Sequence, residues 1–429
     1  MFKIIFLAIF ILSKSCDEST STTYKTTTHK NNPGITTRKK IHTITEHVPE
    51  TRTLHTTQTT PIPITTKTRS SASHHITTSS ITRTSSRTSS SSSTHTSAAF
   101  VTLDRRSGGF LLSGQKFVPV GFNAYWLGFT EEYKYPTHSQ IEEMFIVAKR
   151  LGATVIRSHT LGFSGGSPNS LRPNDNRLNP AAWEPIDYSF SMAQKYNIKL
   201  IVPLIDAYDY YHGSYGEFCK TRGVPKDSFW TNMDVRGDFK EYINIWLGHQ
   251  NMYTGRRIRD DPSLFLIELG NELGNIRPGV GSNTVPTREW IQDISQYIQN
   301  NAPNHLVLHG VDESLGQNDD FNINSIDVFS GHFYSKDYNR IDFGASGARS
   351  VNKPYIIGEY DSNFSEDWYR EIESRGDVHG TLFWSMYPHT GGFGSGSPVP
   401  HNDGYTLHYP ESDQLDRIEQ HFTNMKTKA

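Results

Sequence analysis

Two short apolar runs that carry glutamates decide the fold: LFLIELGNE at residues 264–272 and PYIIGEY at residues 354–360. A strand that is buried on both faces of a parallel sheet reads as a continuous apolar stretch of this length. An acid at the carboxyl end of such a strand lies at the mouth of the barrel or sheet, where active sites collect. Glu272 and Glu359 are therefore expected to come from two different strands and to meet at one mouth.

Two facing carboxyl groups can hydrolyse a glycosidic bond. One carboxyl donates a proton to the leaving oxygen, while the other attacks the sugar or activates water. The two runs thus predict a site for a sugar between Glu272 and Glu359.

The chain from residue 100 onward alternates between strand and helix patterns. Helical periodicity covers residues 141–151, 183–196, 239–252 and 288–300, and the sequence NPAAWE at 179–184 is a strong helix start. Eight apolar strand candidates surround these helices, at residues 117–122, 154–157, 199–204, 264–269, 305–308, 326–330, 355–358 and 381–385. This pattern predicts an α/β fold of the (β/α)8 TIM-barrel type.

A doubly wound open sheet is the alternative fold for an alternating pattern. That fold usually shows a glycine-rich phosphate turn after its first strand. Here the first strand runs into Asn123, Ala124, Tyr125 and Trp126, which is an aromatic stretch and no phosphate cradle. The barrel is therefore favoured, and residues 101–103, 109–112 and 114–117 are expected to form a small hairpin before it.

The first fifteen residues predict a secretory signal peptide. Lys3 supplies a cationic start, residues 4–12 are apolar, and residues 13–15 form a small-residue exit. A membrane anchor is the alternative, but a span needs about 20 apolar residues. We therefore expect cleavage of residues 1–15, a secreted extracellular protein and no membrane span in the mature chain.

Residues 16–99 differ from the rest in composition. Serine and threonine dominate, proline and basic residues are scattered, and large apolar side chains are rare. Such a segment cannot bury enough surface to offset its chain entropy, so we expect a disordered linker. In a secreted protein this composition is typical of an O-glycosylated stalk. The predicted organisation is a signal peptide at 1–15, this Ser/Thr-rich linker at 16–99 and a catalytic domain at 100–429.

Charge and cysteine usage exclude several classes of partner. The whole chain has 42 Lys and Arg against 44 Asp and Glu, of which residues 1–99 hold about 12 and about 4. The remaining part is acidic, which argues against nucleic acid because phosphate binding needs a basic face. The two cysteines, Cys16 and Cys219, form no disulfide framework. No metal-ligand set or cofactor motif is visible, and a neutral glycan is the expected partner.

The residues that follow the predicted strands are polar and aromatic. Any one of them has a structural explanation, since a strand-end Arg often pairs locally and a single Trp often packs in the core. Together, at the same end of successive strands, they predict one binding mouth. The set comprises Asn123, Tyr125, Trp126, Arg157, His159, Asp206, Tyr208, Asn271, Glu272, His332, Tyr334, Glu359 and Trp384.

This set resembles glycoside hydrolase family 5, a family of retaining barrel glycosidases. The resemblance rests on Asn271-Glu272 after the fourth strand, Glu359 after the seventh, and the order of the supporting residues over nearly all of 100–429. Within the family the chain looks most like fungal-type endo-β-1,4-mannanases. Residues 117–126 and the tail HNDGYTLHYP at 401–410 contribute to this likeness.

The resemblance implies a double displacement with a role for each residue. Glu272 would be the acid/base and Glu359 the nucleophile, held ionised by Arg157 and Tyr334. Four further residues would bind the sugar and one would orient Glu272. Asn271 would contact the sugar 2-hydroxyl, His332 would orient Glu272, and Trp384, Trp126 and Tyr208 would offer aromatic faces to the glycan.

The expected function is therefore a secreted retaining endo-β-1,4-mannanase that acts on mannan-type polysaccharide. A β-glucanase or an exo-β-mannosidase of the same family is an alternative. A barrel that binds carbohydrate without catalysis is another, and the presence of both glutamates disfavours it. Asn363-Phe364-Ser365 is an N-glycosylation sequon close to Glu359.

Overall fold

We analysed a computed structural model of the 429-residue chain. The structure describes residues 99–274, 285–311 and 318–428. The expected signal peptide at 1–15 and all but the last residue of the expected Ser/Thr-rich linker lie outside the described residues. Among the described residues, no helix has the length and apolar character that a membrane crossing requires.

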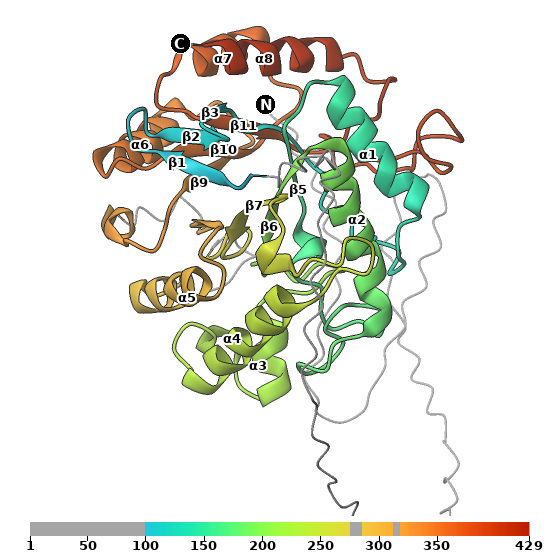
Figure 1. Cartoon of the computed structure of the whole chain (residues 1–429), viewed down its shortest axis with the longest axis vertical. Coiled ribbons are helices and arrows are strands. Elements are labelled where there is room, and N and C mark those ends of the chain that lie inside the picture. Colours follow the sequence, from blue (N-terminus) through green and yellow to red (C-terminus); the bar gives the residue numbers. More distant parts are fainter. Residues whose placement is uncertain (1–98, 275–284, 312–317, 429) are drawn as a thin grey trace, which may run out of the picture. The chain divides into compact units, whose positions relative to one another are not determined.

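Eight parallel strands form one sheet that curls into a nearly closed barrel at the centre of the described part (Figure 1). Their order is β8-β7-β6-β5-β4-β11-β10-β9, and a single parallel bridge between Leu308 and Val328 joins the two ends. The strands are β4 (Val120–Asn123), β5 (Val155–Arg157), β6 (Lys199–Pro203), β7 (Leu264–Glu268), β8 (Leu306–Leu308), β9 (Phe329–Phe333), β10 (Tyr355–Tyr360) and β11 (Gly380–Phe383).

Close strand contact explains one glycine in the barrel. A Cβ atom on Gly121 would lie 1.8 Å from the carbonyl oxygen of Val155 in the neighbouring strand. Only a residue without a side chain fits there, because no real Cβ approaches backbone so closely.

A small antiparallel sheet covers the end of the barrel where the strands begin. It consists of β1 (Val101–Asp104), β2 (Gly109–Leu112) and β3 (Gln115–Phe117). Phe110 and Phe117 pack edge-on against Phe265 of β7, with ring centroids 5.1 and 5.4 Å apart. The expected hairpin is thus present, and it seals one end of the barrel with apolar side chains.

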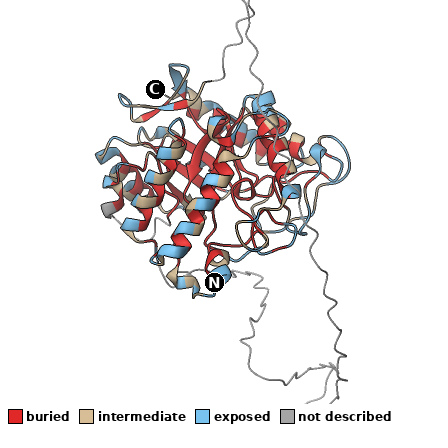
Figure 2. Ribbon diagram, turned by 60° about the horizontal axis from the view of Figure 1, so that its bottom comes forward, coloured by how far each residue is buried: buried red, intermediate tan, exposed pale blue. Residues whose placement is uncertain are grey.

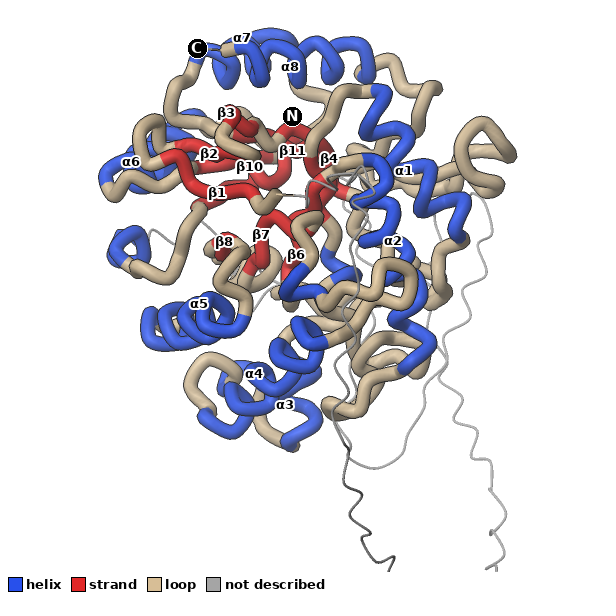
Figure 3. Tube along the Cα trace, in the orientation of Figure 1, coloured by secondary structure: helices blue, strands red, loops and turns tan. Residues whose placement is uncertain are grey.

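Within the described ranges, eight α-helices surround the strands (Figure 3). Their starts follow ordinary capping chemistry: Thr137 and Gln140 form a capping box, and Thr287 accepts from the Trp290 amide. The helices are α1 (His138–Arg150), α2 (Trp183–Tyr196), α3 (Gly216–Arg222), α4 (Met233–Gly248), α5 (Arg288–Asn301), α6 (Tyr338–Ser350), α7 (Glu366–Ser374) and α8 (Leu415–Thr427).

Burial follows these layers (Figure 2). The strands are buried on both faces, and each helix turns a buried side toward the barrel and an exposed side outward. Tyr242 and Trp246 of α4 show the fit, since both are fully buried and both donate a hydrogen bond to a backbone carbonyl oxygen. With one end sealed, the mouth at the carboxyl ends of the strands is left for polar side chains.

The structure confirms the barrel and shifts some of its predicted elements. The sixth barrel strand was expected at residues 326–330 but is β9, Phe329–Phe333. The Asp327 carboxylate accepts a hydrogen bond from the Val307 amide. The first part of the predicted stretch, residues 326–328, therefore lies before the strand. Four helices, α3, α6, α7 and α8, were not predicted. Helix α6 carries the small residues of GASGARS, and α3 and α7 have only seven and nine residues, so each offers only a short pattern.

Candidate active site

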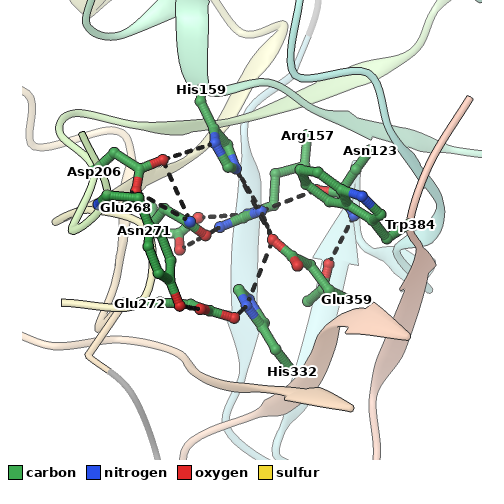
Figure 4. A network of polar contacts seen from close by, with 12 residues as sticks. Asn123, Arg157, His159, Asp206, Glu268, Asn271, Glu272, His332, Glu359 and Trp384 are labelled. Carbon is green, nitrogen blue, oxygen red and sulfur yellow. Dashed lines mark hydrogen bonds and ion pairs between the residues drawn. The ribbon is translucent and has the colours of Figure 1, made fainter. Parts of the chain in front are cut away.

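The predicted mouth residues converge at the carboxyl ends of the barrel strands (Figure 4). They come from seven strands or the first residues after them, so the barrel itself sets their mutual positions. The predicted members are Asn123 (β4), Arg157 (β5), Asp206 and Tyr208 (after β6), Asn271 and Glu272 (after β7), His332 and Tyr334 (in or after β9), Glu359 (β10) and Trp384 (after β11), and Glu268 of β7 lies with them.

Arg157 is the centre of this network. Its Nε and one terminal nitrogen form a two-pronged ion pair with Glu268, at 2.7 and 2.8 Å. The other terminal nitrogen donates to Glu359 Oε1 at 2.8 Å. The guanidinium also donates to the side-chain oxygens of Asn123 and Asn271, each at 2.9 Å. A planar fork of donors suits this task, because it fixes several acceptors at defined angles.

Two donors hold the Glu359 carboxyl group. Arg157 reaches Oε1, and the Tyr334 hydroxyl donates to Oε2 at 2.5 Å. Burial, followed by the charge of Glu359, raises the pKa of Tyr334 well above its ordinary value, so the phenol stays a donor. A Cβ on Gly358 would meet the His332 ring at 2.8 Å, so this glycine makes room for the histidine beside Glu359.

Glu272 receives different partners. The Tyr208 hydroxyl donates to Oε2 at 2.5 Å, and His332 Nδ1 lies 2.9 Å from Oε1. The side chain is 8% exposed, so it is open to a ligand from one side only. Its backbone has φ 47°, a left-handed conformation that costs of order 1–3 kcal/mol outside glycine and clusters at functional sites.

The two carboxyl groups are close to each other. One carboxylate oxygen of Glu272, one of Glu359 and a ring nitrogen of His332 all lie within 4.8 Å of one another. His332 Nδ1 is 3.5 Å from Glu359 Oε1 and thus bridges the pair. Burial lowers the pKa of His332, but the charge of Glu359 and the hydrogen bond with Glu272 outweigh it and raise that pKa above its ordinary value.

A second cluster supports the site from β6. Asp206 lies 3.2 Å from His159 Nδ1 and 2.9 Å from His212 Nε2, and it accepts the Tyr208 amide at 2.8 Å. Burial raises the pKa of the Asp206 carboxyl, but the hydrogen bonds from the two histidines outweigh it and hold the pKa well below its usual value. Asp206 is therefore ionised and anchors the loop that carries Tyr208.

The spacing of this cluster would also suit a metal ion, since its three ligand atoms lie within 4.8 Å of one another. The hydrogen bonds decide against that interpretation. Arg157 can only donate, so His159 Nε2 accepts from it at 3.0 Å and the ring proton resides on Nδ1, facing Asp206. That nitrogen, 3.2 Å from the Asp206 carboxylate, carries the ring proton and offers no lone pair to a cation.

Trp384 forms one wall of the mouth. Its indole stacks on the Tyr125 ring, with centroids 4.7 Å apart and an interplanar angle of 5°. Its N–H donates to Asp403 Oδ2 at 2.8 Å. The ring is partly exposed, so the position of Trp384 agrees with the aromatic face that the sequence predicts there.

Trp126 requires a correction, because it does not line the mouth. The side chain is 2% exposed, packs near Tyr387 and donates its N–H to the Met386 carbonyl oxygen at 3.0 Å. It is a core residue, whereas its neighbour Tyr125, which was also predicted at the mouth, stacks on Trp384.

The sequence alone gave no role to three supporting residues, which are two acids and one histidine. Asp206 and His159 were placed at the mouth but given no task, and Glu268 was read as part of a strand. An acid inside a five-residue apolar strand is the signal that identifies Glu268, because a charge fully buried in a barrel needs a partner of opposite charge.

Comparisons with known proteins agree with this geometry. A model for GH family 5 β-mannosidase-like domains matches residues 181–358. Mannan endo-1,4-β-mannosidase 1 of Oryza sativa subsp. japonica is 29% identical over 319 residues, which are 65% of this chain and 72% of that protein. Mannan endo-1,4-β-mannosidase 4 of Solanum lycopersicum is 26% identical over 362 residues, 72% and 87% of the two chains. The chain spans 58% of the length of two Arabidopsis thaliana relatives, at 27% identity.

Solved structures show the same fold. The endo-1,4-β-mannanase from Rhizomucor miehei is 26% identical, with a TM-score of 0.64, over 77% of this chain and 100% of that chain. The endo-β-1,4-mannanase from Thermotoga petrophila, at 21% identity and a TM-score of 0.61, covers 73% and 78% and supports the fold alone. Residues 181–358 therefore match the GH family 5 β-mannosidase-like model, and the chain, folded as a (β/α)8 barrel, is similar to mannan endo-1,4-β-mannosidases.

Proposed function

We propose that this chain is a retaining endo-β-1,4-mannanase that cleaves β-mannosidic bonds in mannan-type polysaccharide. The observation that carries the proposal is the approach of the Glu272 and Glu359 carboxylates to within 4.8 Å. Retaining enzymes hold the two groups about 5 Å apart, whereas inverting enzymes leave about 6.5–9.5 Å for a water molecule.

Glu359 is the nucleophile in this proposal. Arg157 and Tyr334 each hold one of its oxygens, which orients the carboxylate toward the anomeric carbon. Glu268 neutralises part of the Arg157 charge, so Glu359 keeps enough electron density to attack. The bond that forms is between a Glu359 oxygen and the anomeric carbon, and the bond that breaks is between that carbon and the leaving oxygen.

Glu272 is the acid/base. It protonates the leaving oxygen in the first step and takes a proton from water in the second, after which water has replaced Glu359 on the sugar. Tyr208 and His332 fix the two oxygens of this carboxyl group. Asn271, held by Arg157, supplies an amide for the sugar 2-hydroxyl, and Trp384 supplies an apolar face.

The names of the relatives support β-mannosidic linkages and the endo mode of action. An exo-acting β-mannosidase is the second candidate, because the matching family model is described as β-mannosidase-like. Secretion is also part of the proposal and rests on the signal pattern of residues 1–15.

Product analysis tests this function. The purified enzyme is incubated with linear β-1,4-mannan, and the early products are sized and followed by proton NMR. We expect oligosaccharides of several lengths with the β configuration at the new reducing end. Release of mannose alone would favour the exo-β-mannosidase, and an α-anomer formed first would exclude the retaining mechanism. Turnover of β-1,4-glucan without turnover of mannan would refute the mannanase assignment.

A further inference from the structure

Four polar side chains meet at the rim of the mouth, beside Trp384. The Tyr125 hydroxyl lies 2.7 Å from Glu131 Oε1, 2.8 Å from His401 Nε2 and 3.0 Å from the Tyr387 hydroxyl. We call these four residues the Glu131 cluster. None of them has a part in the mechanism described above.

The hydrogen bonds around His401 define the protonation of this cluster. Thr406 Oγ1 donates to Asp403 at 2.9 Å, so it accepts from His401 Nδ1 at 2.6 Å. Tyr125 has one hydroxyl proton, and it goes to the Glu131 carboxylate. His401 Nε2 contacts the same two oxygens, Tyr125 at 2.8 Å and Glu131 at 3.2 Å.

Glu131 is thus an ionised carboxylate held by the His401 ring and the Tyr125 phenol. Burial raises the pKa of Glu131, but the hydrogen bonds from His401 and Tyr125 outweigh it and lower that pKa below its ordinary value. Both contacts use Oε1, and no hydrogen bond from the described residues reaches Oε2. Because the side chain is 43% exposed, Oε2 is a fixed acceptor that a ligand can reach.

The barrel order places this acceptor across the mouth from the proton donor. Glu131 follows β4 and His401 follows β11, which are adjacent strands. Strand β7, which Glu272 follows, is three strands from β4 in one direction and four from β11 in the other. Glu272 protonates the leaving oxygen, so the leaving sugar extends toward β7 and the retained sugar extends toward β4 and β11.

We propose that Glu131 forms a subsite for the sugar unit on the non-reducing side of the one that reacts, and accepts hydrogen bonds from its hydroxyl groups. The Tyr125 ring, stacked on Trp384, connects this subsite to the reacting sugar. The inference rests on the proposed function, since it uses the assignment of Glu272 as acid/base. It makes Glu131 a determinant of preference for oligosaccharides over single sugar units.

The test compares Glu131→Gln with a matched control. Glu132→Gln changes the neighbouring exposed glutamate, whose carboxylate contacts only the Thr130 hydroxyl among the described residues. For each variant and for the wild type, kcat/KM is measured on β-1,4-mannotriose and on 4-nitrophenyl β-mannoside, which cannot fill the subsite. A hydrogen bond to a charged group predicts that Glu131→Gln lowers the mannotriose-to-aryl-mannoside ratio of kcat/KM about tenfold. Glu132→Gln should leave the ratio at the wild-type value.

Every result bears on the subsite. An unchanged ratio in Glu131→Gln would overturn it, whether both substrates slow equally or neither slows. If the wild type acted only on the corresponding glucosides, the mannanase assignment would be refuted. The subsite would then be tested by the ratio of kcat/KM on cellotriose to kcat/KM on 4-nitrophenyl β-glucoside. A wild type that turns over neither series would refute the proposed function. Trisaccharide binding, measured by calorimetry, must then weaken about tenfold in Glu131→Gln and not in Glu132→Gln.

Discussion

Arg157 and Glu268 form a two-pronged ion pair in which both side chains are fully buried, at 2.7 and 2.8 Å. The same guanidinium donates to Glu359, so one cation serves a structural carboxylate and the proposed nucleophile. Asn123 and Asn271 complete its contacts. The position of the proposed nucleophile therefore depends on a second acid that is fully buried.

Replacing Glu268 should cost both stability and activity. Glu268→Gln keeps the shape of the side chain but leaves Arg157 with an incompletely compensated buried charge, which we expect to lower the free energy of unfolding by about 3–5 kcal/mol. Arg157 would also be free to turn, so kcat should fall. Urea unfolding and steady-state kinetics measure the two effects.

An exposed pair provides the control for that variant. Glu366→Gln breaks the contact with Arg370, in which both side chains are more than half exposed. Such pairs contribute about 0–1 kcal/mol, so unfolding should change little. If Glu268→Gln unfolded like Glu366→Gln, the buried pair would not support the site as described.

Removing the acid/base should make the rate depend on the leaving group. Glu272→Ala cannot protonate a sugar leaving group, so turnover of mannan should fall by several powers of ten. A dinitrophenyl glycoside needs no proton and should be cleaved with a much smaller loss. Glu359→Ala should lose activity on both substrates because it lacks the nucleophile. Equal losses on both substrates in Glu272→Ala would mean that this residue is not the acid.

His332 should make stability depend on pH. Its pKa is raised in the folded state, so the cation adds stability that is fully present below about pH 6.5 and is lost as the pH rises through the folded value. The difference in unfolding free energy between wild type and His332→Asn should shrink from pH 5 to pH 9.

His305 is the control for this prediction, because it is a buried histidine whose pKa is lowered rather than raised. Burial lowers the pKa of His305 to about 4, so its contribution is present above about pH 6.5 and is lost in acid. The difference between wild type and His305→Asn should therefore shrink as the pH falls. Parallel trends in the two variants would contradict the assignment of the His332 charge to Glu359 and Glu272.

The sequence predicts the barrel and most of its mouth because both depend on local patterns. Apolar runs identify the buried strands, and the residue after each run must lie at the carboxyl end of the barrel. Glu272, Glu359 and Arg157 were found in this way. Their close approach follows from the closure of the sheet, which gathers residues more than 80 positions apart in the chain.

Contacts between distant strands could not be predicted in the same way. Glu268 is 111 residues from Arg157, and nothing local to either residue shows that they pair. Trp126 illustrates a different limit. It lies three residues after the end of β4, where the chain turns and loses its strand alternation, so the sequence does not show that the indole points into the core toward Met386.

The central claim is that Glu359 attacks the sugar, and trapping of the intermediate tests it most directly. The enzyme is incubated with 2-deoxy-2-fluoro-β-mannosyl fluoride, whose fluorine slows the second step, and is then digested for mass spectrometry. We expect one fluoromannosyl group per molecule, attached to the peptide that contains Glu359 and absent in Glu359→Gln. A label on any other residue in an enzyme that cleaves β-mannosides would contradict the assignment, and so would rapid turnover of the reagent to an α-configured sugar.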